Sequence, residues 1–182
     1  MASSCKSRRV RNRRTLPPLV LSKEQIDRIM AVTDANPRLH ITRDVVRILL
    51  ETGMRLGELR NLRVSDVDVD NNRLYISGTK TDGRFVPLSP RGLNALQSLH
   101  SQHFSSASVL GEQSSHVLRR VSMTFRKIAS EVGATDHSLH SLRHVFAMRL
   151  AYVGLDPIFL AHVMGNSNPR LILRYYSKHD RS

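Results

Sequence analysis

One stretch of the sequence interrupts an otherwise helical pattern. Between residues 64 and 88 the apolar residues follow the spacing of short strands, and turn-forming residues at 70–72 and 82–83 separate them. On both sides of this stretch the apolar residues recur at helical intervals. The sequence therefore predicts an α+β fold, mainly α with a small three-stranded antiparallel sheet.

Capping residues, prolines and glycines mark the expected ends of the helices. Ser22 is a predicted N-cap, and Gly53 stops the helix that precedes it. Pro87 ends the last strand, and Ser89 and Pro90 open the next helix. We expect helices after residue 22 and over residues 42–53, 55–62, 89–99, 117–133, 140–153, 157–164 and 169–176. The Ser-rich residues 103–114 are expected to form a loop.

The chain is long enough for one folded domain. It has 182 residues, of which 40% are hydrophobic, which suffices for an ordinary core. Residues 1–18 are expected to be a disordered basic tail with a Pro-Pro linker, and residues 19–182 to be the folded domain. The tail also has the acid-free composition of an organelle transit peptide, but it is short and poorly amphipathic for one.

The charge and the cysteine content narrow the class of partner. A formal net charge of +13 favours a polyanion, and nucleic acid is the natural candidate. The sequence has no apolar run of the roughly 20 residues that a membrane span needs, and no secretion signal. Cys5 is the only cysteine, so neither a disulfide framework nor a cysteine metal site is expected. These features predict a cytoplasmic protein.

Four segments occur in an order that folding needs alone do not explain. They are residues 52–59 (TGMRLGEL), 78–88 (GTKTDGRFVPL), 140–144 (HSLRH) and 164–176, which begin Met-Gly-Asn and end Arg-Tyr-Tyr. Together they resemble the tyrosine recombinase (phage integrase) family, whose signature is an ordered Arg, Lys, His-x-x-Arg, His or Trp, and Tyr. The resemblance runs from about residue 42 to 178 and implies the catalytic-domain fold of that family. The N-terminal core-binding domain is expected to be absent, either because the chain is excised from a longer protein or because it is a short, single-domain member.

The chemistry of phosphate transfer supports the same residues. Two guanidinium groups are suited to hold a phosphate on which charge develops, and Arg55 and Arg143 are the candidates. A phenol has a pKa near 10 and needs activation before it can attack. The family's spacing of nine positions after the slot that Asn166 occupies makes Tyr175 the nucleophile. Tyr176 is the alternative nucleophile. If it is not the nucleophile, it is expected to be an aromatic residue that packs the last helix against the rest of the domain.

The resemblance also assigns the proton transfers. Lys80, in the turn between two strands, is the expected general acid for the leaving oxygen, and His140 is expected to exchange a proton with the nucleophile or orient it. His140 and His144 have the spacing of a two-histidine metal site, but no third ligand accompanies them. We therefore expect no metal, and expect His144 to pack on the helix near the site.

Four further residues complete the predicted site. The family resemblance implies that Glu58 holds Arg55 in position, and an ordinary surface ion pair is the alternative. Arg84 and Arg174 are expected to contact DNA. Alternatively, Arg84 lies at the rim of the sheet. Asn166 departs from the family pattern, which has His or Trp in this position. An amide cannot carry a positive charge or transfer protons, so activity should be reduced but not abolished. Alternatively, Asn166 only caps the preceding helix.

The resemblance implies a site-specific recombinase that cleaves and rejoins double-stranded DNA through a 3′-phosphotyrosine intermediate, without a cofactor. It implies a homotetramer on DNA, monomeric when free, located with the nucleoid. Three other classes stay open: a recombinase-derived DNA-binding protein with weakened catalysis, a type IB topoisomerase, and a basic RNA-binding domain. The target site and the outcome of recombination do not follow from the sequence.

Overall fold

The structure is a computed structural model that describes residues 20–78, 83–101, 106–166 and 170–176, except for the side chains of Arg170, Leu171 and Arg174. Its helices are α1 (Lys23–Ala35), α2 (His40–Thr52), α3 (Leu56–Arg60), α4 (Pro90–His100), α5 (Ser114–Glu131), α6 (Leu139–Tyr152), α7 (Pro157–Val163) and α8 (Arg170–Tyr176). Its strands are β1 (Val67–Asp68), β2 (Arg73–Ile76) and β3 (Arg84–Pro87). Short 3-10 helices occupy η1 (Pro37–Leu39) and η2 (Val64–Asp66). The predicted fold class is confirmed.

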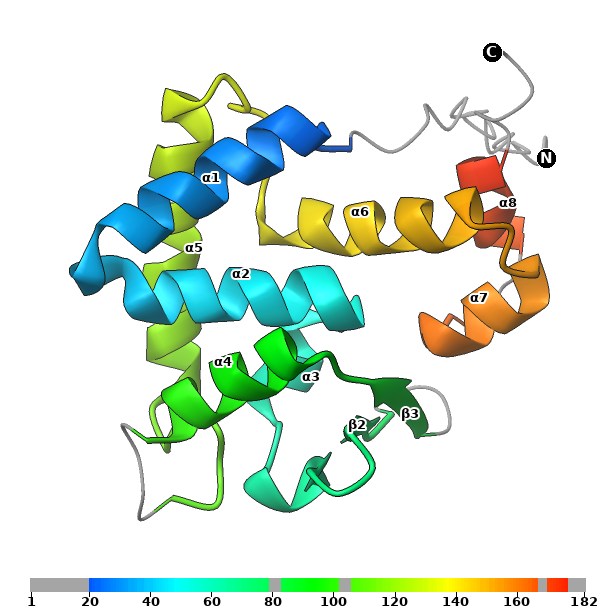
Figure 1. The fold of residues 1–182 in the computed structure, drawn as a ribbon, viewed down its shortest axis with the longest axis horizontal. Helices are drawn as coiled ribbons and strands as arrows, with labels where there is room; N and C mark the ends of the chain where they lie inside the picture. The colour runs from blue at the N-terminus through cyan, green and yellow to red at the C-terminus, as the bar shows by residue number, and fades with distance from the viewer. Residues whose placement is uncertain (1–19, 79–82, 102–105, 167–169, 177–182) are drawn as a thin grey trace, which may run out of the picture.

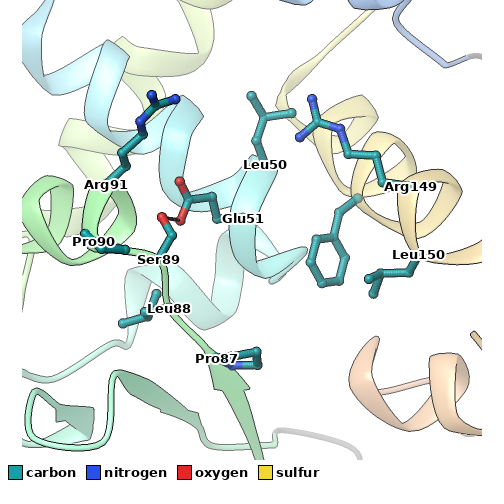
Figure 2. A pocket seen from close by; sticks show the side chains of 10 residues that line it. Leu50, Glu51, Pro87, Leu88, Ser89, Pro90, Arg91, Arg149 and Leu150 are labelled. Carbon is teal, nitrogen blue, oxygen red and sulfur yellow. Dashed lines mark hydrogen bonds between the residues drawn. The ribbon is translucent and has the colours of Figure 1, made fainter. Parts of the chain in front are cut away.

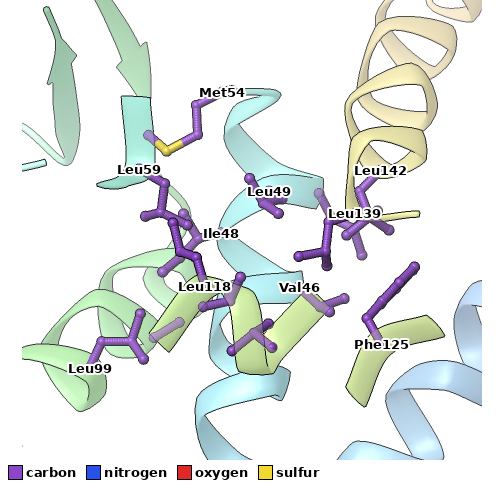
Figure 3. Packing of buried hydrophobic residues seen from close by; sticks show 14 of the residues in the cluster. Val46, Ile48, Leu49, Met54, Leu59, Leu99, Leu118, Phe125, Leu139 and Leu142 are labelled. Carbon is purple, nitrogen blue, oxygen red and sulfur yellow. The ribbon is translucent and has the colours of Figure 1, made fainter. Parts of the chain in front are cut away.

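Helix α2 lies at the centre of the helical layer. It packs against α1, α4, α5 and α6, and Figure 1 shows α6 and α4 on either side of it with α5 crossing behind. The apolar side chains of α2 other than the half-buried Ile41 are buried, because they meet helices on several sides. Figure 3 shows Ile48 and Leu49 of α2 among buried residues of α3, α4, α5 and α6. None of the helices in the described part is long and apolar enough to cross a membrane.

The sheet is antiparallel, in the order β1-β2-β3. Leu74 of β2 pairs with Val67 and Val86, and Ile76 pairs with Arg84. Burial alternates along β3, so that Arg84 and Val86 point inward while Phe85 points outward. An arginine therefore lies on the buried face of the sheet.

A second, smaller apolar cluster joins the last three helices. Phe146 and Ala151 of α6, Leu160 of α7, and Ile172 and Tyr175 of α8 are buried together. Figure 1 shows α7 and α8 at the C-terminal end of α6. The predicted nucleophile is therefore held by packing among these helices.

Candidate active site

Arg55 lies where α2 gives way to α3. Gly53 ends α2 in the left-handed conformation, with φ of 59°, and a Cβ there would meet the ring of Phe146 at 2.2 Å. Arg55 then occupies the N-cap of α3. Its backbone N–H and its Nη1 donate to the two carboxylate oxygens of Glu58, at 2.7 and 2.9 Å. The carboxylate thus fixes both the start of the helix and the guanidinium.

Glu58 also forms a bidentate ion pair with Arg84. Nη1 and Nη2 of Arg84 donate to the carboxylate at 3.1 and 3.0 Å, and the two side chains are 1% and 2% exposed. Burial alone would raise the pKa of Glu58, but the hydrogen bonds from Arg84 and from the Arg55 backbone outweigh it and hold the pKa below its usual value. A guanidinium so enclosed does not face a ligand, so the placement of Arg84 disagrees with the expected DNA contact.

Three arginines from distant parts of the chain meet at the C-terminal end of α7. Arg84 Nε donates to the carbonyl of Val163 at 2.6 Å, and Arg55 Nη2 donates to that of Gly165 at 2.7 Å. Arg143 Nη2 donates to the carbonyl of Met164, which lies between them in the chain. Carbonyls at a helix C-terminus carry partial negative charge and have no partner within the helix. They therefore hold together guanidinium groups that would otherwise repel one another.

Arg143 is buried, and its Nη1 donates to the carbonyl of Gly53 at 2.5 Å. Burial, aided by the charge of Arg55, lowers the pKa of Arg143 to about 10, so the guanidinium stays protonated at neutral pH. Arg55 Nη2 and Arg143 Nη2 approach the same oxygen, Oδ1 of Asn166, at 3.1 and 3.5 Å. The two predicted clamp arginines are thus side by side and aimed at one acceptor.

Asn166 lies at the end of α7 and beside the two predicted clamp arginines, and its part in catalysis stays a prediction. Its backbone N–H donates to the carbonyl of Ala161 at 2.8 Å, which closes the end of α7. Its side chain meanwhile accepts from the two arginines. The turn requires Gly165, whose φ is 58° and whose missing Cβ leaves room for Nη1 of Arg84, 2.6 Å from where that atom would stand.

Helix α6 presents His140, Arg143 and His144 one helical turn apart. His140 keeps contact with solvent, and its pKa is lowered first by partial burial and then by the charges of Arg143 and Arg55. The rings of His140 and His144 meet edge to face, with centroids 4.9 Å apart. His144 Nδ1 lies 2.6 Å from the hydroxyl of Tyr175. Among the residues that the structure describes, the imidazole that contacts the predicted nucleophile is His144, a contact that sequence reasoning missed.

The two adjacent tyrosines point to different places. Tyr175 is 5% exposed and hydrogen bonds to His144. Tyr176 donates its hydroxyl to the carbonyl of Leu155, and burial together with Asp156 raises its pKa. This contact agrees with the packing role considered for Tyr176.

Two predicted residues lie outside the described part: Lys80, and the side chain of Arg174. Among the described residues, no three metal-ligating side chains come together. A cleft of about 730 Å³ lies between α2, the start of α4 and α6. Ser89 donates to Glu51 there at 2.6 Å (Figure 2). No predicted site residue whose side chain the structure describes lines this cleft.

Comparison with known proteins decides the family. Residues 20–182 match the phage integrase family, a range that includes every residue the structure describes. The chain belongs to the phage integrase family. The predicted recombinase resemblance is therefore confirmed.

Individual relatives of this integrase-family chain are longer than it is. It is 26% identical to the transposase from transposon Tn916 of Enterococcus faecalis over 90% of the chain and 48% of the relative. It is 31% identical to tyrosine recombinase XerD of Chlamydia pneumoniae, over 82% of the chain and 54% of the relative. The chain thus spans about half the length of these two relatives.

Solved structures share the fold of this integrase-family chain. The crystal structure of XerA recombinase has a TM-score of 0.71 at 23% identity, covering 91% of this chain and 61% of that one. The Tn1549 transposon integrase in complex with transposon right end DNA has a TM-score of 0.73 at 22% identity, covering 90% and 62%. The arrangement of helices and sheet is that of recombinase catalytic domains.

Proposed function

We propose that this chain cleaves and rejoins double-stranded DNA, with Tyr175 as the nucleophile. The observation that carries the proposal is the convergence of Arg55 and Arg143 on one oxygen, Oδ1 of Asn166. An oxygen between two guanidiniums has the surroundings that a phosphate oxygen needs, and these donors are fixed before any substrate arrives. Side-chain exposure of 39% leaves Arg55 open to a ligand.

Tyr175 is close enough to Arg143 to offset a small part of the lowering of that arginine's pKa. In the proposed reaction the Tyr175 oxygen attacks the phosphorus, the bond to the 5′ oxygen breaks, and a 3′-phosphotyrosine remains. Lys80 is proposed to protonate the leaving oxygen, as the family resemblance implies. Attack by the 5′ hydroxyl of another DNA end reverses the step, and the phosphodiester energy is kept in the covalent bond.

The proposed partner is a DNA duplex near the nucleoid, with a homotetramer assembled on it. The net charge of +13 supports a polyanionic partner. Helix α5 contributes exposed basic residues, namely Arg119, Arg120, Arg126 and Lys127. The XerH recombinase and lambda integrase structures with a similar fold are bound to DNA sites.

Capture of covalent adducts from random DNA tests the proposal and identifies the target sequence at the same time. A pool of random-sequence duplexes, each with a nick near the centre, is incubated with the protein, and DNA that stays attached in denaturant is sequenced. We expect an enriched sequence, attached through Tyr175 by mass spectrometry, and no adduct with Tyr175→Phe. The matched control Tyr176→Phe should still form the adduct.

Other outcomes of the capture experiment would overturn the proposal. Attachment through Tyr176 would reverse the choice of nucleophile. Duplexes retained by the native protein but never attached in denaturant would indicate binding without cleavage. Adducts without sequence enrichment, together with relaxation of supercoiled plasmid, would indicate a topoisomerase.

A further inference from the structure

We propose that His144, rather than His140, is the base that takes the proton from Tyr175 during DNA cleavage. The inference rests on the proposed function of Tyr175 as the nucleophile. Its starting point is the 2.6 Å distance between His144 Nδ1 and the Tyr175 hydroxyl oxygen, which joins α6 to α8. His144 therefore touches a reacting atom in the free protein, before any DNA is bound.

The direction of this hydrogen bond follows from the two groups. A phenol is a good donor, whereas an imidazole nitrogen without a proton is a better acceptor than a phenol oxygen. With the proton of His144 on Nε2, its Nδ1 accepts from the phenol. Donation leaves the lone pairs of the Tyr175 oxygen available for attack on phosphorus. An imidazole is also the side chain that ordinarily exchanges protons near neutral pH.

The surroundings favour transfer of this proton to a protein group. Tyr175 is 5% exposed, so bulk water has little access to it. Tyr175 offsets a small part of the lowering of the Arg143 pKa, which reflects an attraction between the two groups, and a positive charge nearby favours a phenolate over a phenol. Partial burial, with the charges of Arg143 and Arg55, lowers the pKa of His140, and this disfavours a second positive charge next to an imidazolium at His144.

Bonds and protons balance in the proposed step. The bond from the Tyr175 oxygen to phosphorus forms while the bond from phosphorus to the 5′ oxygen breaks. The phenol proton moves to His144 Nδ1, and the leaving oxygen takes a proton from another group, for which Lys80 is proposed. On rejoining, His144 returns its proton to the departing phenolate.

His144→Asn separates basicity from hydrogen bonding. The side-chain oxygen of asparagine can take a position near that of Nδ1 and accept the same hydrogen bond, but it is not a base at neutral pH. On the site recovered by adduct capture, we expect single-turnover cleavage to fall by roughly 100-fold or more. The matched control is His116→Asn, at an exposed position on α5, which should cleave at the wild-type rate.

Two further measurements keep the test independent of folding. Cleavage by His144→Ala should be partly restored by added imidazole, which a folding defect would not allow. A substrate with sulfur in place of the 5′ bridging oxygen has a leaving group that needs no proton. It should leave the His144→Asn defect in place while relieving the defect of Lys80→Ala.

Three outcomes would overturn the inference. One is wild-type cleavage by His144→Asn, and another is relief of its defect by the sulfur substrate, which would assign His144 to the leaving group. The third is failure of imidazole to rescue a folded His144→Ala variant. In each of these cases the proposed function still holds if the wild-type protein forms covalent DNA adducts at Tyr175. If the wild-type protein forms no such adducts, both the proposed function and the inference are wrong.

Discussion

Glu58 and Arg84 form a bidentate ion pair, at 3.1 and 3.0 Å, with almost no exposure to solvent. The same carboxylate accepts two hydrogen bonds from Arg55. A buried pair contributes little net stability when intact, because removing both charges from water costs about as much as their attraction gains. The role of the Glu58 carboxylate here is to position Arg55, the arginine proposed to hold the phosphate.

Replacing Glu58 should destabilise the fold strongly. Glu58→Gln leaves the guanidinium of Arg84 buried without a countercharge, which typically costs about 3–5 kcal/mol. Urea denaturation followed by circular dichroism measures the loss. The control Asp27→Asn breaks the exposed pair with Lys23 and should leave the midpoint nearly unchanged. Equal midpoints for Glu58→Gln and Asp27→Asn would show that Arg84 finds another partner.

The contribution of Glu58 should depend on pH with a definite sign. Its pKa is below the ordinary value of 4.5, so the folded state binds this proton less readily than the unfolded state does. The stabilisation is complete above pH 4.5 and is lost as pH falls through the folded-state pKa. The stability difference between wild type and Glu58→Gln should thus be constant from pH 7 to 5 and shrink at pH 3.5. A difference that persists unchanged in acid contradicts the assignment.

Gly165→Ala should impair both stability and DNA cleavage. The added Cβ would stand 2.6 Å from Nη1 of Arg84 and 3.3 Å from that of Arg55, at a φ of 58°. Gly154→Ala is the matched control, because Gly154 has a φ of 79° but nothing within 4 Å of the Cβ position. The control should be destabilised only by the backbone strain of an alanine at positive φ, by about 1–2 kcal/mol. Cleavage should fall in Gly165→Ala alone, and equal rates would show that the arginines tolerate displacement.

Asn166→His should raise the rate of cleavage. An imidazole in this slot can donate to a phosphate oxygen and carry positive charge, whereas the amide cannot carry charge. Asn166→Ala should lower the rate by roughly tenfold or more, since a hydrogen bond to a charged group is lost. Single-turnover cleavage of the captured site measures both. A slower Asn166→His variant would show that Asn166 does not occupy the family's His or Trp position.

Local patterns in the sequence were sufficient to predict the α-helices and the strands. Ser22 makes the capping box that its position before a helix predicted, and Gly53 ends α2 as expected. The three strands also lie in the stretch with strand spacing. These features depend on residues a few positions apart, which is why the sequence predicts them. The short helices η1 and η2 were not predicted.

The sequence also contains a local signal for the burial of Arg84. This residue is two positions before Val86 in a strand, so the alternation of side chains places both on the same face. Since Val86 is buried, that alternation predicts an inward Arg84, and an inward arginine needs a carboxylate partner. The four ordered segments did indicate the family, which the match over residues 20–182 confirms.

Which side chains meet in the candidate site was decided by the tertiary structure. The contact between His144 and Tyr175 spans 31 residues of chain, and that between Arg84 and the Val163 carbonyl spans 79. The sequence determined the residue types, the helices and strands that carry them, and the family. The packing of α7 and α8 against α6, and of β3 against α7, selected the partners, because contacts between distant segments depend on how whole elements dock, which no local pattern encodes.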